Sequence, residues 1–180
     1  MKQEFLDVVD ENNNFTGEKI ERSIAHDKGV FHRGVHAWIV DDESRVLLQK
    51  RSMRKRINPG VLTSSAAGHI ESGSTPDESM RKEAREELGI VLRELPEPVI
   101  VKRMTRGKSY IENEFLYVYF ISLNLKEEDI TIQKDEVEKV QFMKINNFLE
   151  DYELNSEKYS HYGKDYWQVV FENLRRLEEQ

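Results

Sequence analysis

The chain has 180 residues, a length typical of one domain with its own hydrophobic core. Its 27 basic and 34 acidic residues give a net charge of -7, which argues against a nucleic-acid or membrane-surface binder. The absence of cysteine excludes disulfides, thiolate catalysis and cysteine-ligated zinc. The acidic N-terminal stretch is unlike a signal peptide, and no apolar run reaches membrane-spanning length, so we expect a cytoplasmic protein.

Strand and turn patterns dominate the first part of the chain. Residues 4–17 predict a short strand that runs into an Asn-rich turn, and residues 34–51 predict two strands joined by a polar turn. A Pro-Gly turn follows at residues 59–60, and the small side chains of residues 61–70 predict a third strand. These patterns favour a sheet near the N-terminus.

Helices and strands alternate in the remainder. The sequence predicts a helix over residues 76–88, strands within 97–105 and 113–123, and a strand followed by a short helix over 137–152. Residues 163–180 have helical spacing, with these apolar residues on one side: Tyr166, Val169, Val170 and Leu174. The order predicts a mixed α/β fold, and the N-terminal strand or C-terminal helix offers a surface for a homodimer.

The helix over residues 76–88 has strong end signals. Thr75 as the cap, Pro76 at the first helical position and Glu78 three residues after the cap form a capping box. Gly89 is a typical C-terminal stop. One face of the helix is apolar and carries Met80, Ala84 and Leu88.

Glu83, Glu86 and Glu87 lie along one flank of that apolar face. One interpretation is a solvated amphipathic helix, which pairs such as Asp77 with Arg81 would stabilise. The alternative is a cation site, because three neighbouring carboxylates repel each other unless a cation lies between them. Hard divalent cations such as Mg²⁺ bind carboxylate oxygens.

The spacing of these acids resembles the signature of the Nudix hydrolase family. That signature is G, five residues, E, seven residues, then R-E-(apolar)-x-E-E-x-G-(apolar). The corresponding positions are Gly68, Ser74, Lys82, Glu83, Ala84, Glu86, Glu87, Gly89 and Ile90. Ser74 and Lys82 depart from the signature, and in the family these two positions brace the loop against the helix.

The resemblance implies a Nudix fold, in which a mixed β-sheet lies between helices, and a single Nudix domain over residues 1–180 with its signature at residues 68–90. It also implies Mg²⁺ or Mn²⁺ as the cofactor. The implied metal ligands are Glu83, Glu86, Glu87 and the Gly68 carbonyl.

Residues 25–69 further resemble the Nudix subgroup related to type 1 isopentenyl-diphosphate isomerase. That isomerase builds a second metal site from three histidines and two glutamates. The matching residues are His26, His32, His69, Glu112 and Glu114, with His36 as the alternative to His26. The isomerase also transfers a proton through a cysteine directly before its Gly-His pair, and Ala67 stands there in this chain. Alanine cannot transfer a proton, which argues against isomerisation.

The resemblance implies that Arg51 and Lys55, within a basic stretch, bind the substrate diphosphate. We expect metal-dependent hydrolysis of a nucleoside-diphosphate-linked or related organic diphosphate. The expected catalytic residues are Glu86 and Glu87, with Glu112 or Glu114 as the general base. Two alternatives remain: an isomerase-like enzyme that uses Glu114 and Tyr110, and a binding module in which Ser74 and Lys82 mark a loss of catalysis.

Overall fold

The computed structural model describes residues 3–55, 57–106 and 111–179. Its strands are β1 (Phe5–Val9), β2 (Phe15–Glu21), β3 (His32–Val40), β4 (Arg45–Arg51), β5 (Leu62–Thr63), β6 (Ala66–His69), β7 (Val99–Arg106), β8 (Ile111–Ser122) and β9 (Val137–Lys144). Its α-helices are α1 (Arg22–Lys28), α2 (Pro76–Leu88), α3 (Ile145–Leu154) and α4 (Lys164–Glu178).

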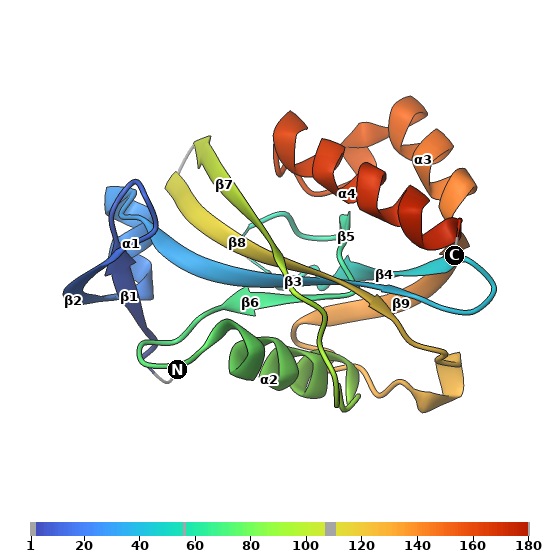
Figure 1. Cartoon of the computed structure of the whole chain (residues 1–180), viewed down its shortest axis with the longest axis horizontal. Helices are drawn as coiled ribbons and strands as arrows, with labels where there is room; N and C mark the ends of the chain where they lie inside the picture. The colour runs from blue at the N-terminus through green and yellow to red at the C-terminus, as the bar shows by residue number, and fades with distance from the viewer. Residues whose placement is uncertain (1–2, 56, 107–110, 180) are drawn as a thin grey trace.

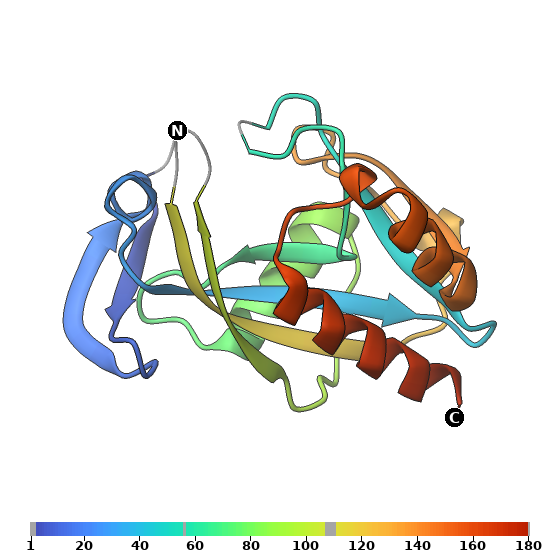
Figure 2. The same cartoon turned by 90° about the horizontal axis from the view of Figure 1, so that it is seen from above.

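A mixed sheet forms the centre of the molecule, in the order β5-β4-β3-β8-β7, with β6 paired to β3 and β9 to β4. Helix α2 covers one face, and α3 and α4 cover the other (Figure 1). The β1–β2 hairpin and α1 lie at the end of the sheet where β3 begins (Figure 2). The sequence-based prediction of a mixed sheet between helices is therefore confirmed.

Two hydrophobic cores hold these layers together, and alternation along β3 supplies both. Val35 and Ala37 pack with the apolar face of α2, whereas Trp38 and Val40 pack with α3 and α4. Trp167 on α4 is buried in the same core as Trp38. Both tryptophans thus serve packing.

A split between β3 and β4 opens the sheet beside α2. The two strands pair only at Val40 and Val46, after which β3 pairs with β6 and β4 with β5 and β9. Ser65 bridges the split, because its hydroxyl donates to the Leu47 carbonyl at 2.6 Å and accepts from the Ile39 N–H at 2.9 Å. The split brings β6 to the N-terminal part of β3.

Three elements differ from the sequence-based prediction, and one of them is β2, which follows the Asn-rich turn and was not predicted. Residues 61–70, predicted as one strand, form the separate strands β5 and β6, because the chain crosses from β4 to β3 at residues 64–65. Helix α1 was not predicted, since its seven residues are too few for a periodic pattern and its cap residue makes no side-chain capping bond. The other predicted strands and helices are confirmed.

Across the described part of the chain, none of the helices combines the length and apolarity needed to cross a membrane.

Candidate functional site

The predicted end signals of α2 are confirmed. The Thr75 hydroxyl accepts from the Glu78 N–H at 3.2 Å, and the Glu78 carboxylate accepts from the Thr75 N–H at 2.9 Å. Gly89 ends the helix in the left-handed region at φ 71°. The apolar face carries the fully buried Met80, Ala84 and Leu88. This packing fixes the direction in which the acidic flank points.

The three acids of α2 do not share one environment. Glu87 is buried, and one of its carboxylate oxygens accepts from the backbone N–H of Ala67 at 3.0 Å and from the side-chain amide of Gln49 at 2.9 Å. Glu83 lies against β6, where a side chain at Gly68 would overlap its carboxyl group. The Glu86 side chain is 52% exposed, which places it at the rim. A side chain at residue 68 would therefore force the Glu83 carboxyl group to move.

Burial disfavours the ionised forms of both Glu83 and Glu87, and the charge of Glu87 adds to this effect at Glu83. Burial first, and then the charge of Glu87, raises the pKa of Glu83 to about 8. Burial raises the pKa of Glu87 to about 7, against the effect of its two hydrogen bonds. A cation between the two carboxylates would relieve this penalty, and an all-oxygen donor set suits Mg²⁺ or Mn²⁺.

Lys82 forms a brace between α2 and the preceding loop. Its ammonium group lies 2.7 Å from a carboxylate oxygen of Glu71. The Glu71 carbonyl in turn accepts from the Ser74 N–H at 3.0 Å. The chain therefore has an ion pair between the loop and the helix, but the acidic residue is Glu71, three positions before Ser74. The sequence analysis did not identify Glu71.

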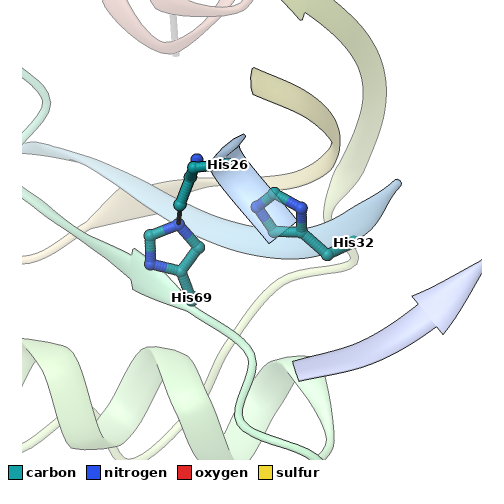
Figure 3. Close-up of side chains that lie close together, drawn as sticks. All are labelled: His26, His32 and His69. Carbon is teal, nitrogen blue, oxygen red and sulfur yellow. Dashed lines mark hydrogen bonds between the residues drawn. The ribbon is translucent and has the colours of Figure 1, made fainter. Parts of the chain in front are cut away.

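A cluster of three histidines lies beside this loop (Figure 3). His26 comes from α1, His32 from the start of β3 and His69 from the end of β6, and one ligand atom from each lies within 4.8 Å of the others. Nε2 of His26 is 3.2 Å from Nε2 of His69. A carboxylate oxygen of Glu114 lies 3.2 Å from Nε2 of His32 and 3.4 Å from Nε2 of His69.

The imidazoles have nitrogen lone pairs to offer a metal. Burial lowers the pKa of His26 to about 3 and that of His69 to about 4, so both are neutral at pH 7. Burial would lower the pKa of His32, but the Glu114 carboxylate beside its Nε2 outweighs burial and raises that pKa, so a metal bound at Nε2 would displace the proton that this pairing favours. Nδ1 of His32 donates to the Val30 carbonyl at 2.8 Å, and Nδ1 of His26 is buried with no hydrogen-bond partner among the described residues. The residues therefore fit a transition metal.

His36, the alternative to His26, lies outside this cluster. The Tyr166 hydroxyl is 2.6 Å from its Nδ1 and accepts from the indole N–H of Trp38 at 3.0 Å. Burial lowers the pKa of His36 to about 3. His36 therefore belongs to the buried contact between the sheet and α4.

Arg103 on β7 holds both glutamates that the sequence nominated as general bases. Its guanidinium donates to Glu112 at 2.6 Å and makes two bonds to Glu114, that from Nε being 3.1 Å long. The guanidinium also lies over the ring of Tyr162, 4.9 Å from the ring centroid. Burial would raise the pKa of Glu114, but Arg103 outweighs it and holds that pKa well below its usual range. Tyr110, the proposed partner of Glu114, lies outside the described residues.

Acidic residues before and within β9 form ion pairs with the basic stretch that begins at the end of β4. The ion pairs join Lys50 to Glu138, Arg54 to Asp135 and Lys55 to Glu136. Arg51 instead donates to the Ile57 carbonyl at 3.2 and 3.3 Å, and it has no ion pair within the described residues. These pairs escaped the sequence analysis because they join residues far apart in the chain.

Comparisons with known proteins agree with this fold. A model of the NUDIX domain matches residues 30–162. An uncharacterised Nudix hydrolase of Clostridium acetobutylicum is 34% identical over 84% of this chain and 76% of its own length. Nudix hydrolase 3 of Arabidopsis thaliana is 36% identical over 91% of this chain, a match that spans only 23% of the plant protein. An isopentenyl-diphosphate Delta-isomerase of Pectobacterium atrosepticum is 26% identical over 90% of this chain and 92% of its own length.

Solved structures share the fold. A protein of Deinococcus radiodurans has a TM-score of 0.69 and 21% identity, over 96% of this chain and 98% of that one. The NUDIX domain of Shewanella oneidensis NrtR, solved with ADP ribose, has a TM-score of 0.61 and 17% identity, over 81% and 87% of the two chains. This chain belongs to the Nudix hydrolase family, enzymes that act on diphosphate bonds in phosphorus-containing compounds.

Proposed function

We propose that this protein is a Mg²⁺- or Mn²⁺-dependent pyrophosphohydrolase of a nucleoside-diphosphate-linked or related small organic diphosphate. The observation that carries the proposal is that Glu83 lies against Gly68 and Glu87 is bonded to the neighbouring Ala67 N–H, with the pKa values of both carboxyls raised. Such a pair is unfavourable in the folded protein unless a cation lies beside it. Membership of the Nudix hydrolase family supports the same reaction class.

Glu83, Glu86, Glu87 and the Gly68 carbonyl would hold the Mg²⁺ or Mn²⁺. When bound, such an ion neutralises a diphosphate and promotes ionisation of an attacking water. The bonds from Ala67 and Gln49 fix one oxygen of Glu87 and so direct the other oxygen away from β6. This orientation is built into the edge of the sheet, because the Ala67 N–H belongs to β6.

The histidine cluster supports a second metal ion. His26, His32 and His69 would bind it with the Glu114 oxygen that faces them. Three imidazoles and one carboxylate suit a transition metal better than Mg²⁺. Glu114 pairs with Arg103 through one oxygen and faces His32 and His69 with the other. Glu112 is left out of this ligand set, because the contact it makes is with Arg103.

Arg51 and Lys55 would bind the diphosphate. Arg51 is free of acidic partners among the described residues and can offer its planar fork to phosphate oxygens. The charge of Arg51 also lowers the pKa of Glu87, after the larger effect of burial. Its positive charge therefore acts on Glu87 and would act on a diphosphate bound beside it.

An isomerase reaction has less support. Relatives named as isopentenyl-diphosphate isomerases favour it, and so does the histidine cluster. However, Ala67 has no proton to transfer, and Arg103 stabilises Glu114 as an anion that cannot act as a proton donor. Neither Ala67 nor Glu114 can therefore supply the proton that isomerisation requires.

The test is release of phosphate or nucleoside phosphate from a panel of nucleotide sugars, nucleoside di- and triphosphates, dinucleotides, coenzyme A and prenyl diphosphates. Each is assayed with and without Mg²⁺ or Mn²⁺. We expect metal-dependent turnover that falls by at least about 100-fold in Glu87→Gln or Glu86→Gln. Glu150→Gln is the control, because Glu150 is exposed on α3, away from the site.

The outcomes separate the three candidate functions. Near-wild-type turnover in both variants would refute the assigned metal site. Conversion of a prenyl diphosphate without phosphate release would establish the isomerase. Binding of a diphosphate without any turnover would establish a binding module.

A further inference from the structure

Two ion pairs lie next to each other between the loop after β4 and the turn before β9. Arg54 pairs with Asp135 and Lys55 pairs with Glu136 (Figure 2 shows the two segments side by side). The Arg54 and Asp135 side chains are 75% and 72% exposed, whereas those of Lys55 and Glu136 are 22% and 36% exposed. The first pair is thus the outer one and the second the inner one.

Backbone hydrogen bonds anchor the turn that carries Glu136. The Gln133 N–H donates to the Glu87 carbonyl at 3.1 Å, so the turn rests on the C-terminal end of α2. The Ser52 N–H donates to the Glu136 carbonyl at 2.9 Å, which ties the same turn to the basic loop. Val137, the next residue, is the strand partner of Arg51. Glu136 is therefore fixed between the acidic helix and the basic loop.

The electrostatics agree with this placement. Burial is the main cause of the raised pKa of Glu87, and the charge of Glu136 adds to it. Glu136 is thus close enough to act on Glu87 through space, although its own side chain remains partly exposed. A substrate diphosphate bound at Glu87 would lie within the same field.

Other acids near the site are already engaged. Glu112 and Glu114 are buried and bonded to Arg103, whereas Glu83 lies against Gly68 of β6 and Glu87 accepts from the Ala67 N–H. Glu136 differs, because its side chain pairs with the ammonium group of Lys55, which we assign to the diphosphate. Partly exposed ion pairs contribute only about 0–1 kcal/mol, so Lys55 can exchange Glu136 for a phosphate oxygen at small cost.

We propose that Glu136 accepts the proton of the attacking water, and that Lys55 frees it for this role by moving to the diphosphate. This inference rests on the proposed hydrolase function. As the water oxygen bonds to phosphorus, its proton passes to the Glu136 carboxylate. The bridging P–O bond breaks, and the leaving phosphate keeps the electron pair of that bond. Glu136 then loses the proton to solvent and pairs with Lys55 again.

Steady-state kinetics of Glu136→Gln test this assignment, on whichever diphosphate the wild-type protein hydrolyses. We expect kcat to fall by about 100-fold or more while KM changes less than about threefold.

Lys55→Met should raise KM by about tenfold, because it removes a contact to the diphosphate. The double variant should have the kcat of Glu136→Gln alone, since the two residues act in sequence. Asp135→Asn and Arg54→Met alter the outer pair and should leave both constants within about twofold.

Thermal unfolding accompanies the kinetics to verify that each variant folds. If Glu136→Gln does not fold, Glu136→Asp takes its place, and its shorter side chain should still lower kcat selectively. A kcat within about threefold of wild type in the folded variant would overturn the role of Glu136 and leave the hydrolase function standing. An equal loss in the outer-pair variants would also overturn it, because it would indicate a structural clamp. A wild-type protein without metal-dependent hydrolysis would refute both proposals together.

Discussion

Replacing Glu83 by glutamine in the metal-free protein should make the fold more stable at pH 8. The pKa of Glu83 is raised from 4.5 to about 8, so the folded state favours the protonated form. The stabilisation from that protonation is complete below about pH 4.5 and is lost as the pH rises through about 8. The difference between the two pKa values corresponds to about 4 kcal/mol of destabilisation at pH 8. We halve this value to about 2 kcal/mol, because Glu83 is partly exposed and because protonation of Glu87 relieves part of the repulsion.

Glutamine keeps the shape of Glu83 without its charge. For a chain of this length the gain corresponds to a Tm about 4–8 °C higher at pH 8, and to almost no change at pH 5. The assay is thermal unfolding in EDTA at pH 5, 6.5 and 8, compared with Glu86→Gln, whose side chain is exposed. Comparison at each pH cancels the titration of the histidines. A Tm difference that stays constant from pH 5 to 8 would refute the reasoning, as would an equal gain in Glu86→Gln.

Two further substitutions test the supports of the site. Arg103→Met should destabilise the protein by about 3–5 kcal/mol, because it leaves Glu112 and Glu114 buried without their cation. Arg103→Lys should destabilise it less, because the lysine keeps the positive charge. Equal free energies of unfolding for the two variants in urea denaturation would contradict the pairing of Arg103 with both glutamates. Gly68→Ala should lower the free energy of unfolding by about 1–3 kcal/mol, because the added methyl group overlaps Glu83. For the same reason the affinity for Mn²⁺, measured by calorimetry, should fall at least tenfold. An unchanged affinity would show that the position of Glu83 does not depend on residue 68.

Local signals in the sequence were sufficient for α2 and its loop. The capping box, the apolar face and Gly89 fix where the helix begins and ends, and all of them act within a few residues. Because these signals fix the orientation of α2, Glu83 and Glu87 point to the same side of the helix, since they are four residues apart. The resemblance to the Nudix signature rested on those same positions.

Contacts across the sheet could not be predicted in the same way. Nothing near Arg103 in the sequence indicates that it faces Glu114, because the contact depends on the register of β7 and β8. The pairing of Lys55 with Glu136 depends similarly on the register of β4 and β9. The choice between His26 and His36 required α1, a helix too short to leave a periodic pattern.

The parallel pairing of β3 with β8 bears on how the protein folds. In this register His32 stands directly opposite Glu114, and the two residues are separated by a large part of the sequence. Parallel strands that are distant in the chain pair slowly, because a long loop must close before any contact rewards it. The histidine cluster with its glutamate therefore forms only after the central sheet closes. A nascent chain that has not yet made β8 has the three histidines but lacks the carboxylate that completes their site.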